Sequence, residues 1–397
     1  MLEALSRSFH HRNFRLFFAG QFISLIGTWM QSVALSWLVY QLTGSSMYLG
    51  LIGFINNFPV FVLGLWGGYL ADRWNKRALL VATQVSFMLQ ALALAFLTLG
   101  GVVTFWAVAA LALLAGAITA VDMPTRQSFV VEMVGREDLH NAIALNSSMF
   151  NSARILGPAL AGLLVAAIGE GYCFLANGLS YLAVIAGLLL MRLPPAPRKV
   201  PSAPMIAHLV EGLTYAWRDR PMRAILLGMV VLNIFGASYM VLMPVMADAV
   251  LGQGAQGMGF IMGATGLGSV VAALVLALRR EGKGLDRWRV LSGLGFSLTL
   301  VLFGCSRTYW LSLALAPVIG FCLILSFAAA NTELQLRSPD VMRGRIMSLY
   351  AITLVGMAPF GSLLAGAVAD LFSAPLAIGL TGALCAISIG ILTITHA

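Results

Sequence analysis

The sequence Gly68-Tyr69-Leu70-Ala71-Asp72-Arg73-Trp74-Asn75-Lys76-Arg77 separates two long apolar stretches of the chain. One acid and three bases within these ten residues cannot lie in hydrocarbon, because each charge costs about 2.5–3.5 kcal/mol at the centre of a membrane helix on insertion scales. The segment therefore predicts a short turn at a membrane surface, between one membrane-spanning helix and the next.

Composition indicates a membrane protein along the whole chain. Of the 397 residues, 60% are apolar and only 10% are charged, and the mean hydropathy is +0.91. Soluble domains carry about 25% charged residues, so this composition excludes a soluble globular protein. The net charge of +9 does not indicate a nucleic-acid partner, because the bases lie in the turns between apolar stretches.

Twelve apolar stretches are each long enough to cross a hydrocarbon core of about 30 Å. The predicted spans of the first half are 14–41, 47–71, 78–99, 102–122, 139–168 and 172–192. Those of the second half are 223–248, 257–279, 289–306, 309–332, 343–369 and 374–395. Of the 24 Lys and Arg, 22 lie on one side, in the N-terminal segment and alternate turns. The positive-inside rule then predicts that both termini are cytoplasmic.

A proline-rich segment divides the chain into two parts. Residues 193–204 contain five prolines, which cannot continue a helix and predict a linker. Apolar residues then recur at helical spacing over 205–219, which predicts an amphipathic helix on the membrane surface. We therefore predict an N-terminal six-helix bundle at 1–192, a cytoplasmic linker with this helix at 193–222, and a C-terminal six-helix bundle at 223–397.

The turn at 68–77 resembles the signature between helices 2 and 3 of the major facilitator superfamily, with Asn75 where that family usually has Gly. Gly157-Pro158 resembles the helix 5 signature of its antiporters. Further segments resemble its enterobactin-exporter and macrolide-efflux group: 23–31, 43–45, 122–127 and 343–348. The resemblance implies an all-α fold of twelve transmembrane helices in two pseudo-symmetric halves. It also implies secondary active export by alternating access.

The resemblance also implies a set of gating or conformational residues. They are Asp72, Arg73, Arg77, Asp122, Arg126, Gly157, Pro158 and Arg343. Asp72 is expected beside Arg73 or Arg77 and near the positive N-terminal end of the helix around Arg343.

The predicted fifth span carries a smooth face and a proline. Ala153, Gly157 and Ala161 recur at a spacing of four, so another helix can approach closely on that side. Pro158 lacks the N–H that would bond the carbonyl of Arg154, which favours a bend.

Polar side chains within the spans form the candidate substrate-binding set, because polar groups at membrane depth face protein or water. They are Gln21, Thr28, Trp29, Gln31, Asn56, Asn57, Asn151, Arg154, Asn233 and Asn331. Interhelical hydrogen bonding is the alternative for each amide. A cavity lined by amides and aromatic rings would suit bulky amphipathic compounds.

Arg154 is the only charge near the middle of any predicted span. It follows Asp138 by 16 residues, which places it roughly 24 Å along the helix. Guanidinium remains protonated at any workable pH, so a partner is required. A structural or gating role and direct binding of an anionic group are both consistent with this position.

The sequence predicts a transporter and leaves its energy source open. No acid lies in mid-span; the family resemblance implies proton antiport, with Asp122 as the acid expected for proton coupling. Because no nucleotide-binding loop, catalytic triad or metal-ligand cluster occurs, we expect no enzyme, no metal and no cofactor. The expected protein is a monomeric exporter of amphipathic drug-like or siderophore-like molecules in a bacterial cytoplasmic membrane. Its expected mechanism is proton antiport, and its partners are substrate, protons and lipids, without nucleic acid. A lipid or lysolipid flippase and a non-transporting sensor are the alternatives.

Overall fold

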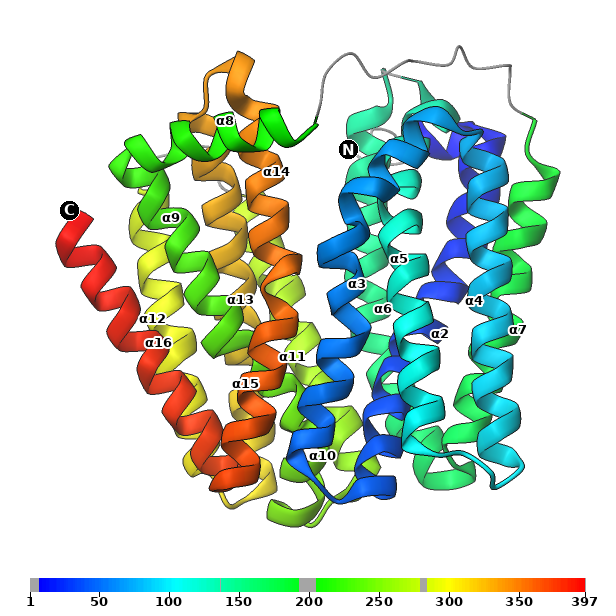
Figure 1. Ribbon diagram of the computed structural model, residues 1–397, viewed down its shortest axis with the longest axis vertical. Coiled ribbons are helices and arrows are strands. Elements are labelled where there is room, and N and C mark those ends of the chain that lie inside the picture. Colours follow the sequence, from blue (N-terminus) through cyan, green and yellow to red (C-terminus); the bar gives the residue numbers. More distant parts are fainter. Residues whose placement is uncertain (1–6, 136, 193–204, 279–283, 397) are drawn as a thin grey trace. The chain divides into compact units, whose positions relative to one another are not determined.

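The computed structural model describes residues 7–135, 137–192, 205–278 and 284–396. This part of the chain is helical and contains no strand. It holds twelve helices, two of them interrupted, that are long and apolar enough to cross a membrane, as predicted (Figure 1). The first six are α2 (Arg12–Thr43), α3 (Ser46–Arg73), α4 (Lys76–Leu99), α5 (Phe105–Val134), α6 (Leu139–Ile168) and α7 (Glu170–Leu190). A short 3-10 helix, η1 (Arg7–His10), precedes them.

The second six begin after α8 (Met205–Arg218). The uninterrupted ones are α11 (Gly254–Ala277), α12 (Leu285–Cys305), α13 (Tyr309–Arg337) and α16 (Ala374–His396). The seventh span consists of α9 (Arg220–Val231), η2 (Leu232–Gly236), η3 (Ala237–Leu242), α10 (Met243–Val245) and η4 (Met246–Val250). The eleventh span consists of α14 (Asp340–Gly356) and α15 (Ala358–Leu371).

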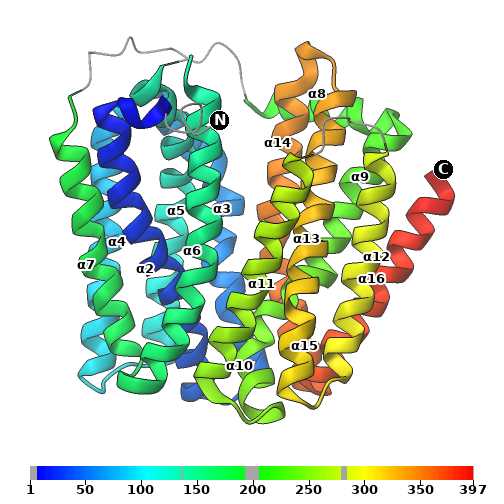
Figure 2. The ribbon, with the colours of Figure 1, turned by 180° about the vertical axis from the view of Figure 1, so that it is seen from behind.

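The chain divides into two compact units. The first unit runs to Leu38 and resumes at Phe58, and the second takes Val39–Asn57 together with the described residues from Met205 onward. In the first unit α4 and α7 lie side by side (Figure 2), and in the second unit α12 and α16 do so (Figure 1). The division therefore passes through α2 and α3 and does not follow the loops.

The segment 39–57 is held in the second unit by close packing and by hydrogen bonds. A Cβ placed on Gly50 would lie 2.6 Å from the carbonyl oxygen of Ser362, so α3 and α15 approach at backbone contact. Ser45 Oγ also donates to Asp370 Oδ1 at 2.7 Å. The absence of a side chain at position 50 is therefore required for this contact.

Helix α5 extends twelve residues beyond the end of the predicted span, which was placed at 122. The prediction ended there because Asp122 and the following charges mark a membrane boundary by composition. In the structure Arg126 Nη2 lies 2.8 Å from Asp122 Oδ2, one turn along the same helix. The helix continues because the two charges neutralise each other along one face.

The seventh span is irregular where a continuous helix was expected. A π-helical turn, η2, replaces the regular ladder at Leu232–Gly236. Within it, the side chain of Asn233 donates to the carbonyl oxygens of Met229 and Thr353, both at 3.3 Å. Side-chain bonds to backbone carbonyls of this kind accompany π-bulges and helix distortion. Pro244, near the start of α10, then marks the next change of geometry.

The amphipathic helix predicted after the linker is present as α8. Its Glu211 forms an ion pair with Arg345 of α14, while Val210, Leu213 and Trp217 are exposed. Helix α8 thus keeps an exposed apolar stripe while Glu211 holds it to α14, which suits a helix lying at a membrane interface.

The predicted smooth face of α6 is confirmed as a helix contact. Ala153 and Ala161 are fully buried. A Cβ on Gly157 would lie 3.0 Å from the carbonyl oxygen of Ile26 and closer still to Trp29 Cβ, both on α2. Pro158 lies inside α6 without interrupting it.

We predict that Gly157→Ala lowers the free energy of unfolding by about 1–3 kcal/mol, because the added methyl group overpacks a contact with backbone. A denaturing-detergent titration of purified protein measures this change. Gly64→Ala is the matched control, since a Cβ there meets no atom within 4 Å. An equal effect of the two substitutions would contradict the importance of the α2–α6 contact.

Candidate functional site

Asp122 is the centre of a buried polar cluster in the first unit. Its side chain is 1% exposed. From α4, Thr83 Oγ1 and Gln84 Nε2 each donate to Asp122 Oδ1 at 2.8 Å. Arg126 Nη2 lies 2.8 Å from Oδ2. The carboxylate is therefore satisfied by two neutral donors and one cation, which is what a charge at this depth requires.

One atom of this cluster has no partner. Gln84 Oε1 is buried and accepts no hydrogen bond among the described residues. Buried polar atoms without a partner cost free energy and are uncommon in folded proteins. The unpaired acceptor lies on the same amide whose nitrogen bonds Asp122, so the two groups form one hydrogen-bonding unit.

A chain of three amides connects helices α2, α4 and α7. Asn177 Nδ2 donates to Gln31 Oε1 at 2.8 Å, and Gln31 Nε2 donates to Gln90 Oε1 at 3.2 Å. This arrangement places Gln31 in interhelical hydrogen bonding, the alternative considered from the sequence. Sequence reasoning did not select Gln84, Gln90 or Asn177, although an amide inside an apolar helix was the available signal.

Thr28 lies beside this chain of amides and has a different environment. It is exposed, and its Oγ1 donates to the carbonyl oxygen of Ser24 at 2.9 Å. The same oxygen is 3.3 Å from the hydroxyl of Tyr181, whose ring is stacked on Phe87 with centroids 5.7 Å apart. The stacking of Tyr181 on Phe87 therefore positions the Tyr181 hydroxyl beside the Thr28 hydroxyl.

Arg154 lies against an aromatic pair formed by α2 and α6. Its Cζ is 5.8 Å from the centre of the Trp29 ring, a distance at which a cation is attracted by the ring face. Trp29 in turn meets Phe150 edge to face, with centroids 5.6 Å apart. Asn151 does not join this group through its amide nitrogen, which donates to the carbonyl oxygen of Ser147 at 2.9 Å in its own helix.

The other predicted binding residues are distributed over both units. Gln21 is 3% exposed and lies in the first unit. Asn56 is half-buried, and Asn57 Nδ2 donates to the carbonyl oxygen of Gly53 at 2.9 Å. Asn331 Oδ1 accepts from Gln335 at 2.7 Å. The position of Asn233 in the π-helical turn was given above.

Segment 68–77, in which only residues 74–75 lie outside α3 and α4, does not contain the ion pair expected within the first unit. Asp72 is exposed and forms neither a hydrogen bond nor an ion pair with Arg73 or Arg77. Instead, Arg73 Nη1 donates to the hydroxyl of Tyr69 at 2.8 Å, and Arg77 Nη2 donates to the carbonyl oxygen of Leu189 at 2.6 Å. The tyrosine one turn earlier and an unpaired carbonyl at the end of α7 compete successfully for the guanidinium groups. Arg343 lies in the first turn of α14, in the second unit.

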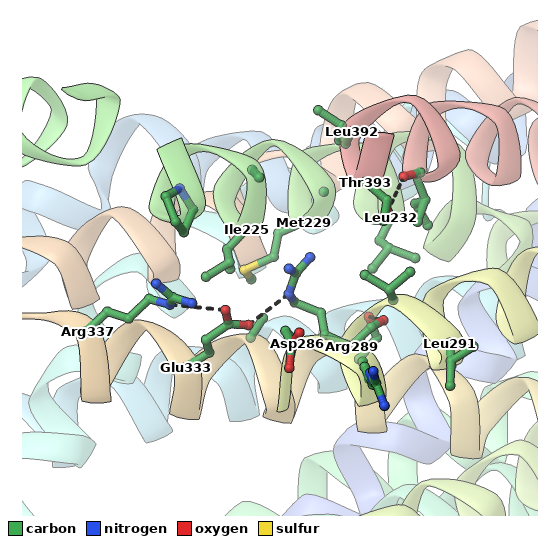
Figure 3. A pocket seen from close by; sticks show the side chains of 18 residues that line it. Ile225, Met229, Leu232, Asp286, Arg289, Leu291, Glu333, Arg337, Leu392 and Thr393 are labelled. Atoms are coloured by element: carbon green, nitrogen blue, oxygen red, sulfur yellow. Dashed lines mark hydrogen bonds and ion pairs between the residues drawn. The ribbon is translucent and has the colours of Figure 1, made fainter. Parts of the chain in front are cut away.

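The second unit contains its own buried acid, Glu333 of α13. Arg289 Nε of α12 lies 3.0 Å from Glu333 Oε2, and Arg337 Nε lies 3.1 Å from Oε1. Figure 3 shows this acid between the two guanidinium groups. Across the described residues, no cluster of three His, Cys, Asp or Glu side chains has metal-ligand geometry.

Comparison with known proteins gives a consistent result over nearly the full length. Residues 5–396 match the profile of the family described as "Transmembrane secretion effector". The chain is 28% identical to the staphyloferrin A transporter of Staphylococcus aureus, covering 90% of both proteins. It is 26% identical to the enterobactin exporter EntS of Shigella flexneri, covering 90% of this chain and 85% of that protein.

Solved structures agree in fold. The nucleoside transporter NupG superposes with a TM-score of 0.78 at 12% identity, covering 96% of this chain and 98% of that one. A bacterial homologue of the lysosomal transporter Spinster gives a TM-score of 0.70 at 11% identity, covering 96% of this chain and 94% of that one. At such identities the likeness shows the shared architecture alone.

Proposed function

Since the chain belongs to the transmembrane secretion effector family of the major facilitator superfamily, we propose that it exports a siderophore-like anionic molecule by proton antiport. The chain is a multi-pass membrane transporter and not an enzyme. Its relatives over nearly the full length transport staphyloferrin A and export enterobactin. The observation that carries the substrate class is the Arg154–Trp29 pair within the first unit.

The proposal includes the setting in which transport occurs. The protein would act as a monomer in a bacterial cytoplasmic membrane, with both termini in the cytoplasm as the distribution of Lys and Arg predicts. Alternating access would use the predicted six-helix bundles 1–192 and 223–397, joined by the linker 193–222. Amphipathic drugs are the wider substrate class, and lipids surround the transporter.

Arg154 and Trp29 suit an anion that also carries an apolar or aromatic surface. Molecules that chelate ferric iron present anionic oxygen atoms, because a hard cation prefers oxygen ligands. A guanidinium group binds such oxygens through two parallel N–H bonds, and an adjacent indole offers a flat apolar face. The Thr28, Gln31 and Asn151 side chains and the buried Gln21 belong to the same unit. In the second unit, the proposed binding residues are Asn56, Asn57, Asn233 and Asn331.

We predict that Arg154→Gln weakens binding of enterobactin or staphyloferrin A about tenfold or more, because a charge-assisted contact worth about 1.5–3 kcal/mol is lost. Binding of a cationic dye should change less than about twofold. Isothermal titration of purified protein measures both. Arg15→Gln is the control, since it removes an exposed arginine of α2 that is not part of the proposed binding set. Equal losses for anion and dye would leave Arg154 with a structural role and remove the support for an anionic substrate.

Asp122 is the proposed proton carrier. A protonated Asp122 would need an acceptor for its new O–H group, and the described cluster contains one unpaired acceptor, Gln84 Oε1. Rotation of the Gln84 amide by half a turn would place this oxygen where the nitrogen now bonds Asp122. Arg126 would then lose its anionic partner, which links protonation to a rearrangement of α5.

We predict that Asp122→Asn abolishes export driven by a proton gradient, with a fall of at least about tenfold in initial rate, while substrate exchange without a gradient continues. Asparagine keeps the shape of the side chain but cannot carry a proton. Proteoliposomes with an imposed pH difference measure both activities. Glu132→Gln is the matched control on the same helix, since Glu132 pairs with Lys76 and its loss should leave the gradient response within about twofold. Gradient-driven export by Asp122→Asn would contradict this role.

The residues Asp72, Arg73, Arg77, Asp122, Arg126, Gly157, Pro158 and Arg343 are the proposed gating and conformational set. The charge of Asp72 does not stabilise the first unit through an ion pair, since Asp72 is exposed and pairs with neither Arg73 nor Arg77. A charge of this kind is available for a contact made in one state of the transport cycle only.

We predict that Asp72→Asn lowers the maximal transport rate about tenfold, which corresponds to roughly 1.4 kcal/mol on the rate-limiting step, and leaves the substrate Kd within about twofold. Transport kinetics and equilibrium binding on the same preparation separate the two quantities. An unchanged transport rate would remove Asp72 from the gate, and a weakened Kd would assign it to the binding site.

A further inference from the structure

The second unit contains a cavity that the transport proposal does not use. It has a volume of about 730 Å³ and lies among α9, α12, α13 and α16 (Figure 3). Ligand pockets in proteins commonly measure 300–1,000 Å³. All of its lining residues belong to this one unit, so it is a feature of the second bundle itself.

One side of the cavity carries an excess of positive charge. Its charged lining residues are three arginines and two acids: Arg287, Arg289, Arg337, Asp286 and Glu333. Arg289 uses its Nε for Glu333, and neither of its terminal nitrogens donates a hydrogen bond within the described part of the chain. Arg287 is exposed and has no hydrogen-bond or ion-pair partner there. The guanidinium of Arg287 and the terminal nitrogens of Arg289 are thus available to bind an anion on this side of the cavity.

The remaining wall is apolar except for Ser326 and Thr393, and it reaches the outer surface of the bundle. Ile225 and Met229 of α9 and Leu232 of η2 face the cavity opposite the charged residues (Figure 3). Leu291 of α12 also lines it and is 67% exposed. Because α12 is a membrane-spanning helix, a surface that carries exposed leucine lies in hydrocarbon. The cavity therefore connects a group of arginines with the region of lipid chains.

In the first unit, side chains fill the space beside α2, the helix whose sequence corresponds to α9. Arg12, Arg15 and Gly20 of α2 recur 208 residues later as Arg220, Arg223 and Gly228 of α9. In this register Phe14 and Phe17 correspond to Met222 and Ile225. Both phenylalanines are buried in a continuous apolar core of the first unit, whereas Ile225 borders the cavity.

Gly20 and Gly228, which correspond in this register, also differ in how closely a neighbouring helix packs against them. A Cβ on Gly20 would lie 2.7 Å from the carbonyl oxygen of Ala183, so α2 and α7 touch at that level. A Cβ on Gly228 would meet only Arg289 Nη1, at 3.9 Å. Helix α9 thus has no close backbone neighbour where α2 has one, and smaller side chains leave the space open.

We propose that this cavity binds an anionic phospholipid, with the phosphate on Arg287 and Arg289 and part of one acyl chain against α9. Phospholipids are the molecules that present an anion and a hydrocarbon chain together at a membrane surface, and basic pockets between membrane helices recognise such headgroups. The lipid completes the packing of the second bundle where side chains complete the first.

Native mass spectrometry of the purified full-length protein, equilibrated with equal amounts of phosphatidylglycerol and phosphatidylcholine, tests the proposal. The wild-type protein should retain phosphatidylglycerol preferentially. Arg287→Gln should lower its affinity about fivefold, which is the contribution of one arginine near an anionic headgroup. Gly228→Leu should abolish retention by filling the cavity. If this variant does not fold, Ile225→Phe fills the same space with the side chain that the first unit has at the corresponding position, Phe17.

Matched controls separate the cavity from general effects. Arg15→Gln removes an equally exposed arginine from the first unit, and Gly390→Leu adds a leucine to α16 where a Cβ meets no atom within 4 Å. Both should retain lipid like the wild type. Equal retention of the two lipids by the wild type, or undiminished retention by both filled variants, would overturn the proposal. So would displacement of the lipid by millimolar glycerol phosphate, since a free phosphate site would need no acyl chain.

Discussion

Hydrocarbon solvates neither a peptide group nor a charge, and this constraint determines how the chain is organised. Every backbone group within a span must be bonded inside a helix, which explains why the described residues form helices and no strand. Charges are confined to the turns or are neutralised by partners within the fold. Asp122 and Glu333 are the two acids buried in the described part of the chain, and each has at least one arginine within 3.1 Å.

The two buried acids are neutralised in different ways, and this difference has chemical consequences. Asp122 receives two neutral donors and one arginine, so loss of its charge leaves one cation to be accommodated. Glu333 is held between two arginines, so its protonation would leave two cations close together in a medium of low dielectric constant. This difference is consistent with the proposal that Asp122 is the proton carrier, while Glu333 pairs with both arginines and holds Arg289 beside the cavity.

Contacts between helices depend on the absence of side chains as much as on their presence. Gly157 lets α6 approach α2, and the same contact positions Trp29 beside Arg154. Where no such approach occurs, as at Gly228, the bundle retains internal space. The uninterrupted α2 and the irregular seventh span, with its π-helical and 3-10 turns, thus reflect different packing of related sequences. Irregular turns within helices of this kind are frequent at functional sites.

The sequence by itself determined the number of spans, the break between the second and third spans, and the family, because hydrophobicity and charge accumulate residue by residue along the chain and need no knowledge of neighbours. It also identified Arg154 as exceptional, since a charge in an apolar stretch is visible in one dimension, whereas Asp122 stood at the end of a predicted span and its burial was not foreseen. Only the tertiary structure decided their surroundings. Thr83 and Gln84 reach Asp122, and Asn177 reaches Gln31, because α4 and α7 are rotated to present those faces. The cavity beside Arg289 depends on how closely four helices approach. Rotation and separation arise from the packing of many side chains together, and no single segment of sequence contains them.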